Sequence, residues 1–349
     1  MNSKSAKIRI PAVMLLVLCT ALAFLIANIL ALESKTEASV DVILPAAATD
    51  AVLRTAVPAT PTPAPTLAPL LADTGSETTP PPYPFWSEGM LFTGDSYRSP
   101  TLSVDVTVTN DAKTFGRRVI YYVADVRVAD VTQIRTEAYT GDFARARHGD
   151  VEKMAWRVDA LIAISGDYCG FRKDSLIIRN GEVYRTMHNK NDDVCLLLRD
   201  GEMKTIPAAK VDMDAILDMD PWQAWEFGPS LLDANGRAYA SFRDSYISPR
   251  NPRCCLGYME PGHYCFVVVD GRQAVSHGLT LVELAQLMES LGCRAAYNLD
   301  GGASAHMYWK NDILNSPSGG GREMSDIIYI AKEPYPASRF FCGKEGRSE

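Results

Sequence analysis

The chain has 349 residues and a formal net charge of −7, and 22% of its residues are charged. This length suits one large domain or two smaller ones. The chain lacks the strongly basic balance typical of nucleic-acid-binding proteins, so we expect no nucleic-acid partner.

The N-terminal residues predict a membrane anchor. Residues 1–9 include three basic side chains, and residues 11–32 carry no charge. About 20 apolar residues span a bilayer as a helix, and the positively charged flank stays in the cytoplasm. We therefore predict a cytoplasmic N-terminus over 1–9, a signal anchor over 10–32 and a single-pass membrane protein with an extracytoplasmic C-terminal domain. A cleaved signal peptide is the alternative, although its apolar region is usually shorter, ~7–15 residues.

The next segment predicts a linker. Residues 33–95 are rich in Pro, Thr and Ala and contain few large side chains. Such a composition cannot bury a core, and its prolines favour an extended, disordered stalk. We expect one folded domain over 96–332, followed by a solvated tail over 333–349.

The domain opens with strand patterns. Residues 103–110 and 118–128 alternate apolar and polar side chains or are rich in β-branched and aromatic residues. A buried strand follows within 159–172 and runs into a glycine turn. Asn-Gly and Asp-Gly pairs favour tight hairpin turns, so we predict hairpins around Asn180-Gly181 and Asp200-Gly201, and a third hairpin within 228–239.

A strand–helix–strand pattern follows in residues 263–302. The first predicted strand ends at Asp270. Thr280 and Glu283 have the spacing of a capping box, and apolar residues at helical spacing follow on one face. The second predicted strand ends at Asp300. We therefore predict an α+β fold with a mixed, mostly antiparallel sheet and one parallel crossover that carries the site.

The crossover places two acids at one edge of the sheet. Ligands of open sheets bind where parallel strands end, and Gly301 and Gly302 let a ligand approach the backbone closely. Asn298 alternates with Asp300 and should share its face. We take Asp300 as the first candidate catalytic residue, with Asn298 and Ser304 as ligand contacts. A plain Asp-Gly turn is the alternative.

Several other residues suggest an anion site. We interpret Asp270 as a second acid and Arg272 as an anion clamp. The glycine run that ends in Gly320 and Gly321 precedes Arg322 and Glu323, and its backbone N–H groups are suited to wrap a phosphate. The remaining candidates are Arg253 for the same anion, Asp167 after the buried strand, and His277 and His306 as proton carriers. Each of these has a purely structural alternative.

Metal and thiol chemistry are less defined. A divalent cation fits among these acids, but no ligand spacing demands one, so we expect no required cofactor. Seven cysteines lie outside the predicted anchor, and an odd number cannot all pair within one chain. We expect the adjacent Cys254 and Cys255 to pack as small apolar side chains or to pair with separate partners.

The order of four motifs resembles the phosphodiester glycosidase family. These are "VVVDGR", "GLTLVELAQLM", "YNLDGGAS" and "SGGGREMSDIIYI", and "AISGDYCGF", "FGPSLL" and "NPRCCLGY" also fit. The resemblance covers roughly residues 96–332. It implies a hydrolase that cleaves a sugar-1-phosphodiester and releases a free sugar, most simply of the N-acetylglucosamine type, and a phosphomonoester.

The resemblance suggests roles for the candidates. Asp300 would act at the anomeric carbon, with Asp270 and Glu323 as supporting carboxylates. The substrate contacts would be Arg253, Arg272, Arg322, Asn298, Gly301, Gly302, Ser304, Gly320, Asp167 and His306. We expect a cell-envelope glycan or exopolysaccharide as substrate. The alternatives are a non-catalytic surface protein that binds glycans and a phosphodiesterase that cuts the P–O bond.

Overall fold

The structure is a computed structural model, and it describes residues 91–92, 94–143, 147–243 and 247–332. The predicted anchor over 10–32, almost all of the predicted linker and the tail lie outside these residues. No helix within the described part of the chain is both long and apolar enough to cross a membrane.

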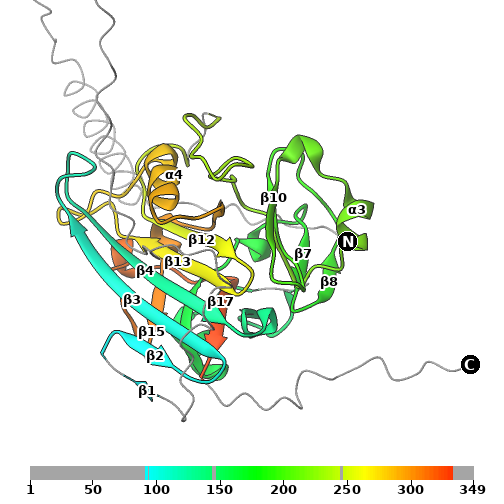
Figure 1. Ribbon diagram of the computed structural model, residues 1–349, viewed down its shortest axis with the longest axis horizontal. Coiled ribbons are helices and arrows are strands. Elements are labelled where there is room, and N and C mark those ends of the chain that lie inside the picture. The colour runs from blue at the N-terminus through cyan, green and yellow to red at the C-terminus, as the bar shows by residue number, and fades with distance from the viewer. Residues whose placement is uncertain (1–90, 93, 144–146, 244–246, 333–349) are drawn as a thin grey trace, which may run out of the picture. The chain divides into compact units, whose positions relative to one another are not determined.

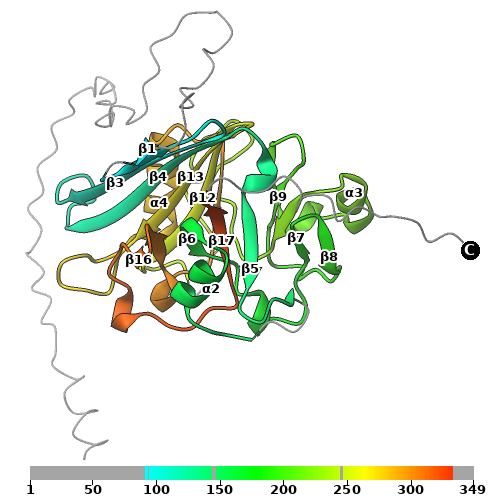
Figure 2. The same ribbon diagram turned by 90° about the horizontal axis from the view of Figure 1, so that it is seen from below.

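The described region contains three β-sheets in which neighbouring strands are antiparallel (Figures 1 and 2). The first has the order β1 (Leu91–Phe92), β2 (Ser96–Arg98), β3 (Leu102–Asp111), β4 (Val119–Val128), β13 (His263–Val269), β12 (Arg253–Glu260) and β14 (Ala295–Asn298). The second has the order β16 (Asp312–Ile313), β15 (Met307–Trp309), β6 (Ala160–Ser165), β17 (Asp326–Ala331) and β5 (Arg135–Ala138). The third has the order β10 (Met203–Ile206), β9 (Val194–Leu197), β11 (Gln223–Trp225), β7 (Ile177–Arg179) and β8 (Glu182–Arg185).

Helices are few and short. The described α-helices are α2 (Val151–Arg157), α3 (Met213–Asp218) and α4 (Leu281–Ser290). Single 3₁₀ turns occur at Val131–Gln133, Cys169–Phe171, Ala208–Lys210, Gly302–Ser304 and Ser318–Gly320. The α+β architecture with mostly antiparallel strands is therefore confirmed. The predicted mixed sheet was wrong, because every strand pair in the described region is antiparallel.

Two hydrophobic clusters cover the two faces of the first sheet. The larger joins one face of that sheet to residues of the other two sheets, with Leu256, Phe266 and Ile328 fully buried. The smaller lies between the opposite face and α4, and it includes Leu284 and Met288. Because both faces are covered, β12 and β13 are buried along almost their whole lengths.

The predicted local signals are largely confirmed. The strands within 102–128 pair as β3 and β4, and the hairpins at Asn180-Gly181 and Asp200-Gly201 form. The capping box of α4 forms, because Thr280 accepts from the Glu283 backbone and Glu283 accepts from the Thr280 backbone. The predicted third hairpin was wrong in extent: it is reduced to one isolated bridge between Leu232 and Ala238.

The crossover differs from the expectation in one respect. β13 and β14 run in the same direction, but both pair antiparallel with β12, which lies between them. The two strands therefore still end at one edge, beside Arg253 at the start of β12, although they are not neighbours.

Candidate functional site

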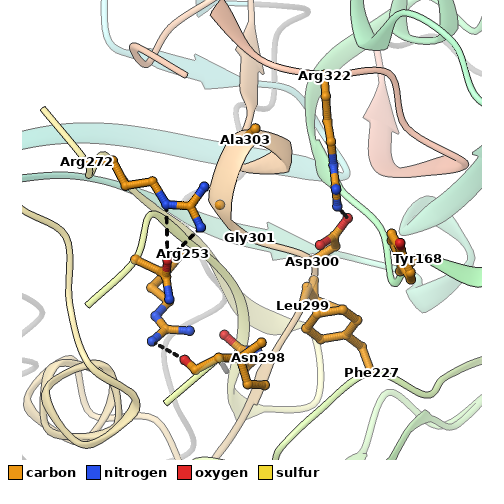
Figure 3. A pocket seen from close by; sticks show the side chains of 13 residues that line it. Tyr168, Phe227, Arg253, Arg272, Asn298, Leu299, Asp300, Gly301, Ala303 and Arg322 are labelled. Carbon is orange, nitrogen blue, oxygen red and sulfur yellow. Dashed lines mark hydrogen bonds and ion pairs between the residues drawn. The ribbon is translucent and has the colours of Figure 1, made fainter. Parts of the chain in front are cut away.

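A cavity of about 200 Å³ opens at the edge where β13 and β14 end (Figure 3). It is lined by Tyr168, Phe227, Ile247, Asn251, Arg253, Arg272, Asn298, Leu299, Asp300, Gly301, Gly302, Ala303 and Arg322. Seven predicted site residues are thus brought together: Arg253, Arg272, Arg322, Asn298, Asp300, Gly301 and Gly302. Asp300 is the one carboxylate among the described residues that line this cavity.

Asp300 is held where the first two sheets meet. Its backbone N–H donates to the Gly166 carbonyl, 3.1 Å away, directly after β6. Its side chain is 5% exposed and accepts from Arg322 over 2.7 Å. Burial raises the pKa of Asp300, while Arg322 and the Ser304 hydroxyl oppose that rise. Arg322 also donates to the Ser304 hydroxyl, so the carboxylate has a fixed orientation.

Two arginines reach the cavity from the other strand ends. Arg253 is buried and donates to the carbonyls of Leu279, Ile247 and Pro249 over 2.6–2.9 Å. Burial, with the nearby Arg272 charge, lowers the pKa of Arg253 to about 10.

Arg272 is exposed and donates twice to the Asn251 side-chain oxygen. Within the described residues, neither Arg253 nor Arg272 has a carboxylate within ion-pair distance. Their positive charge is therefore available to an anion in the cavity (Figure 3).

The glycines after Asp300 are required by close backbone packing. A Cβ on Gly301 would lie 2.6 Å from the Pro252 carbonyl oxygen. Gly302 has φ +64°, and a Cβ there would lie 3.2 Å from the Arg272 guanidinium. Gly301 is therefore required by the close Pro252 backbone, and Gly302 is favoured by its positive φ.

Asn298 lines the cavity and carries an unsatisfied acceptor atom. Its side-chain N–H donates to the Gly228 carbonyl over 2.8 Å, which fixes the amide orientation. The Oδ1 atom is buried and has no hydrogen-bond partner among the described residues. A buried acceptor without a partner costs free energy, so this atom suits a ligand O–H or N–H donor.

The side chains of Tyr168 and Phe227 form an aromatic wall of the cavity, which the sequence analysis did not predict. The rings of Tyr168 and Phe171 stack 4.1 Å apart, and Phe171 stacks on His148. The Arg322 guanidinium lies 5.3 Å from the Tyr168 ring centre. Tyr168 lies in the motif AISGDYCGF and Phe227 begins the motif FGPSLL, but neither residue was predicted to line the site.

Asp270 lies outside the cavity. Its carboxylate accepts from the Tyr122 hydroxyl, the Asn315 amide and the Ser316 backbone, over 3.0–3.2 Å. Side chains alternate along a strand, so Asp270 shares the face of Phe266, which packs between the sheets. Asp300 instead lies beyond the end of β14, and its side chain pairs with Arg322. The two acids follow strands that run in the same direction, but their carboxylates contact different residues.

Three further candidates border a neighbouring cavity. Gly320, Glu323 and His306 line a space of about 760 Å³ that shares only Arg322 with the cavity at Asp300. Burial lowers the pKa of His306, and its Nδ1 lies 2.9 Å from the Ser304 carbonyl oxygen. His277 is exposed on the surface and contacts the Arg118 carbonyl.

Asp167 is part of a buried ionic cluster. Arg179 pairs with Asp167 over 2.7 Å and with Asp326 over 3.4 Å, and all three side chains are fully buried. These two acids and Cys169 lie close enough together to suggest a metal site. The Arg179 guanidinium pairs with both of these acids. Asp167 does not line the cavity.

A second cavity adjoins the first. It has a volume of about 330 Å³ and shares Phe227 and Ile247 with the cavity at Asp300. Arg172 pairs with Asp192 over 2.6 Å in its lining. The cleft therefore extends beyond the space beside Asp300.

Comparisons with known proteins agree with this architecture. Residues 159–331 match the model of the phosphodiester glycosidase family. A SPbeta prophage-derived uncharacterized protein, YomE, of Bacillus subtilis (strain 168) is 28% identical over 218 residues. That alignment covers 59% of this chain and 33% of YomE, so the chain spans about a third of that relative.

Two solved structures share the fold. One is the zebrafish N-acetylglucosamine-1-phosphodiester alpha-N-acetylglucosaminidase catalytic domain, auto-inhibited by its pro-peptide, with a TM-score of 0.56 and 20% identity. That match covers 67% of this chain and 85% of the zebrafish chain. A hypothetical protein from Synechocystis has a TM-score of 0.50 and 13% identity, with 66% of this chain and 62% of that chain covered.

The candidate site lies within the region that matches the family model. The family match includes the strand end at Asp300 and the arginines on both sides of the cavity. Residues 159–331 therefore form a domain that matches the model of the phosphodiester glycosidase family.

Proposed function

We propose that this chain hydrolyses a sugar-1-phosphodiester between the anomeric carbon and the phosphate oxygen. Water adds to the sugar, and the phosphate leaves as a phosphomonoester. The observation that carries the proposal is the placement of the Asp300 carboxylate in one cavity with Arg253 and Arg272, two guanidinium groups without carboxylate partners in the described region.

The two arginines suit the phosphate group. Guanidinium groups bind phosphate through charge-assisted hydrogen bonds, and here they also stabilise the negative charge that the leaving phosphate gains. Arg253 is fixed by three backbone carbonyls, so it needs little reorganisation. Arg272 is exposed and also lines the cavity, so it would bind the same phosphate.

Asp300 suits the anomeric centre. Arg322 favours the ionised form of its carboxylate and holds it in place. An ionised carboxylate attacks the anomeric carbon or removes a proton from the attacking water. Glycosidases generally use a second carboxylic acid to protonate the leaving group. A phosphate leaves more readily than an alcohol, so one carboxylate in the cavity is sufficient for this substrate.

The sugar would lie between Asn298 and the aromatic wall. The unsatisfied Asn298 oxygen accepts from a hydroxyl or acetamido N–H of the sugar, and the Tyr168 ring covers an apolar sugar face. An N-acetylglucosamine-type sugar meets both requirements. A cell-envelope or exopolysaccharide glycan at the outer side of the membrane is the substrate that the predicted anchor favours.

The direct test is hydrolysis of UDP-N-acetylglucosamine by the purified full chain in ¹⁸O-labelled water. Cleavage of the anomeric C–O bond yields free sugar that carries the label, together with UDP. Asp300→Asn should abolish this product, whereas Asp312→Asn, at an exposed acid in β16, should retain it. Label in a phosphate group and a sugar 1-phosphate product would instead establish P–O cleavage.

The single carboxylate in the cavity also favours a second candidate, a non-catalytic glycan-binding protein, because most glycosidases need two. Saturable binding of UDP-N-acetylglucosamine without turnover, measured by calorimetry, would support that candidate and exclude hydrolysis of this substrate. The location is tested separately. A retained anchor keeps the intact N-terminus in the membrane fraction, whereas a cleaved signal peptide shortens the mature chain.

A further inference from the structure

Two buried thiols lie in contact beneath α4. The Sγ atoms of Cys265, in β13, and Cys293, just after α4, are 3.6 Å apart. Both side chains belong to the hydrophobic cluster between the first sheet and the helix. Cys265 is fully buried and Cys293 is 3% exposed.

Gly257 provides the space for both sulfur atoms. This residue pairs with Cys265 across β12 and β13. A Cβ at position 257 would lie 2.5 Å from the Cys265 sulfur and 2.7 Å from the Cys293 sulfur. The close approach of the two thiols therefore depends on a glycine in the middle of a buried strand. Glycine in the interior of a strand usually weakens that strand.

We propose that Cys265 and Cys293 form an intrachain disulfide when the chain folds in an oxidising environment. The sulfur atoms must approach from 3.6 Å to the covalent distance of about 2.05 Å. The bond would close a loop of 28 residues that contains α4 and the end of β13. It would thereby fix the crossover that ends in Asp300. This inference does not depend on the proposed activity.

The other described cysteines are placed differently. Cys254 faces the opposite side of β12 and contacts the Ser165 carbonyl. Cys255 shares the α4 side, but its sulfur contacts the Leu256 carbonyl. The neighbours Cys254 and Cys255 therefore pack separately as small buried side chains, and in the described region the Cys265–Cys293 pair is the one in sulfur–sulfur contact.

The chemistry is thiol–disulfide exchange with a small-molecule disulfide such as oxidised glutathione. One cysteine thiolate attacks the oxidised glutathione and releases one reduced glutathione. The second thiolate attacks the mixed disulfide, forms the Cys265–Cys293 bond and releases the second reduced glutathione. The protein loses two electrons and two protons, and the glutathione gains them. Because both sulfurs are buried in the folded domain, the exchange takes place during folding.

The test uses the full chain, unfolded with reductant and refolded with either a glutathione redox buffer or excess dithiothreitol. Free thiols are then alkylated, and the protein is digested without reduction for mass spectrometry. We expect a linked peptide pair that contains Cys265 and Cys293 in the oxidised sample only. Recovery of both residues as alkylated thiols from correctly folded oxidised protein, or their linkage to other cysteines, would overturn the proposal.

Thermal unfolding provides a second readout. A disulfide that closes a loop of this size should raise the Tm of the oxidised chain by about 5–10 °C above that of the reduced chain. Cys293→Ser should remove this redox-dependent difference, whereas the matched variant Cys255→Ser, on the same face, should retain it. An equal redox-dependent shift in Cys293→Ser would contradict the assignment, and the peptide analysis of the unmutated chain does not depend on how either variant folds.

Discussion

Arg253→Met and Arg272→Met distinguish the contribution of each arginine to phosphate binding from its contribution to stability. Methionine keeps an unbranched side chain and removes the charge. At Arg272 the backbone has φ +58°, and because methionine is also an L-residue with a Cβ, the substitution leaves the backbone strain unchanged. The only hydrogen bonds that the Arg272 side chain makes to described residues go to Asn251 at the surface.

The expected effects differ because the two environments differ. A hydrogen bond to a charged group contributes about 1.5–3 kcal/mol, so Arg272→Met should raise KM about 10–150-fold with little change in Tm. Arg253→Met leaves three backbone carbonyls without their donor. With an overall cost of about 3 kcal/mol, this variant should also lower the Tm by about 6–12 °C.

The assay measures the release of free sugar from UDP-N-acetylglucosamine across substrate concentration, at low and at high salt. The KM of the unmutated chain should rise with salt more steeply than that of Arg272→Met, because the phosphate contact at the exposed arginine is screened. Arg199→Met, at an exposed arginine paired with Asp220, is the matched control. An unchanged KM for Arg272→Met would refute the reasoning and remove this residue from the phosphate site.

Three further predictions concern the cavity and the buried cluster. Asn298→Leu should lower kcat/KM about 10–100-fold with UDP-N-acetylglucosamine, and the loss should be smaller with UDP-glucose if the acetamido N–H is the donor; equal losses would assign a hydroxyl instead. Gly301→Ala should reduce kcat/KM because its Cβ meets the Pro252 carbonyl at 2.6 Å, whereas Gly94→Ala, with open space around it, should behave as the unmutated chain. Burial and the nearby Asp167 charge raise the pKa of Asp326 from its ordinary value of 3.8 to about 7, so the folded state holds this proton more tightly. Stability contributed by this group should therefore fall as the pH rises from about 4 to 7, by at most about 1.4 kcal/mol per pH unit. Urea unfolding at pH 5 and 8 should show a smaller decrease for Asp326→Asn, and parallel decreases would argue against the shifted pKa.

Local sequence patterns predicted individual strands and helices better than they predicted which strands pair. Alternation indicated β3 and β4, and the Thr280–Glu283 spacing indicated the start of α4. The insertion of β12 between β13 and β14 was not predictable, because hydrophobic periodicity carries no information about which strands pair.

The same limit applies to the site. The strand end at Asp300, with its two glycines, was a reliable local signal for a cavity. The contacts of Asp270 with Asn315 and Ser316 depend on a loop more than 40 residues away, which no local pattern indicates. The ion pair between Asp167 and Arg179 depends on the packing of β7, because Arg179 lies in that strand. Asp167 is therefore buried, although its sequence position suggested a ligand contact.

The central position of β13 in the first sheet limits where a truncated form of the chain can begin. The family match starts at residue 159, but β13 pairs along its whole length with β4, which lies before that boundary. A fragment that begins at 159 would expose the unpaired backbone edge of a buried, apolar strand, and such edges promote aggregation. It would also remove the Tyr122 hydroxyl from Asp270. The smallest soluble expression unit should therefore include the first hairpin, from about residue 91.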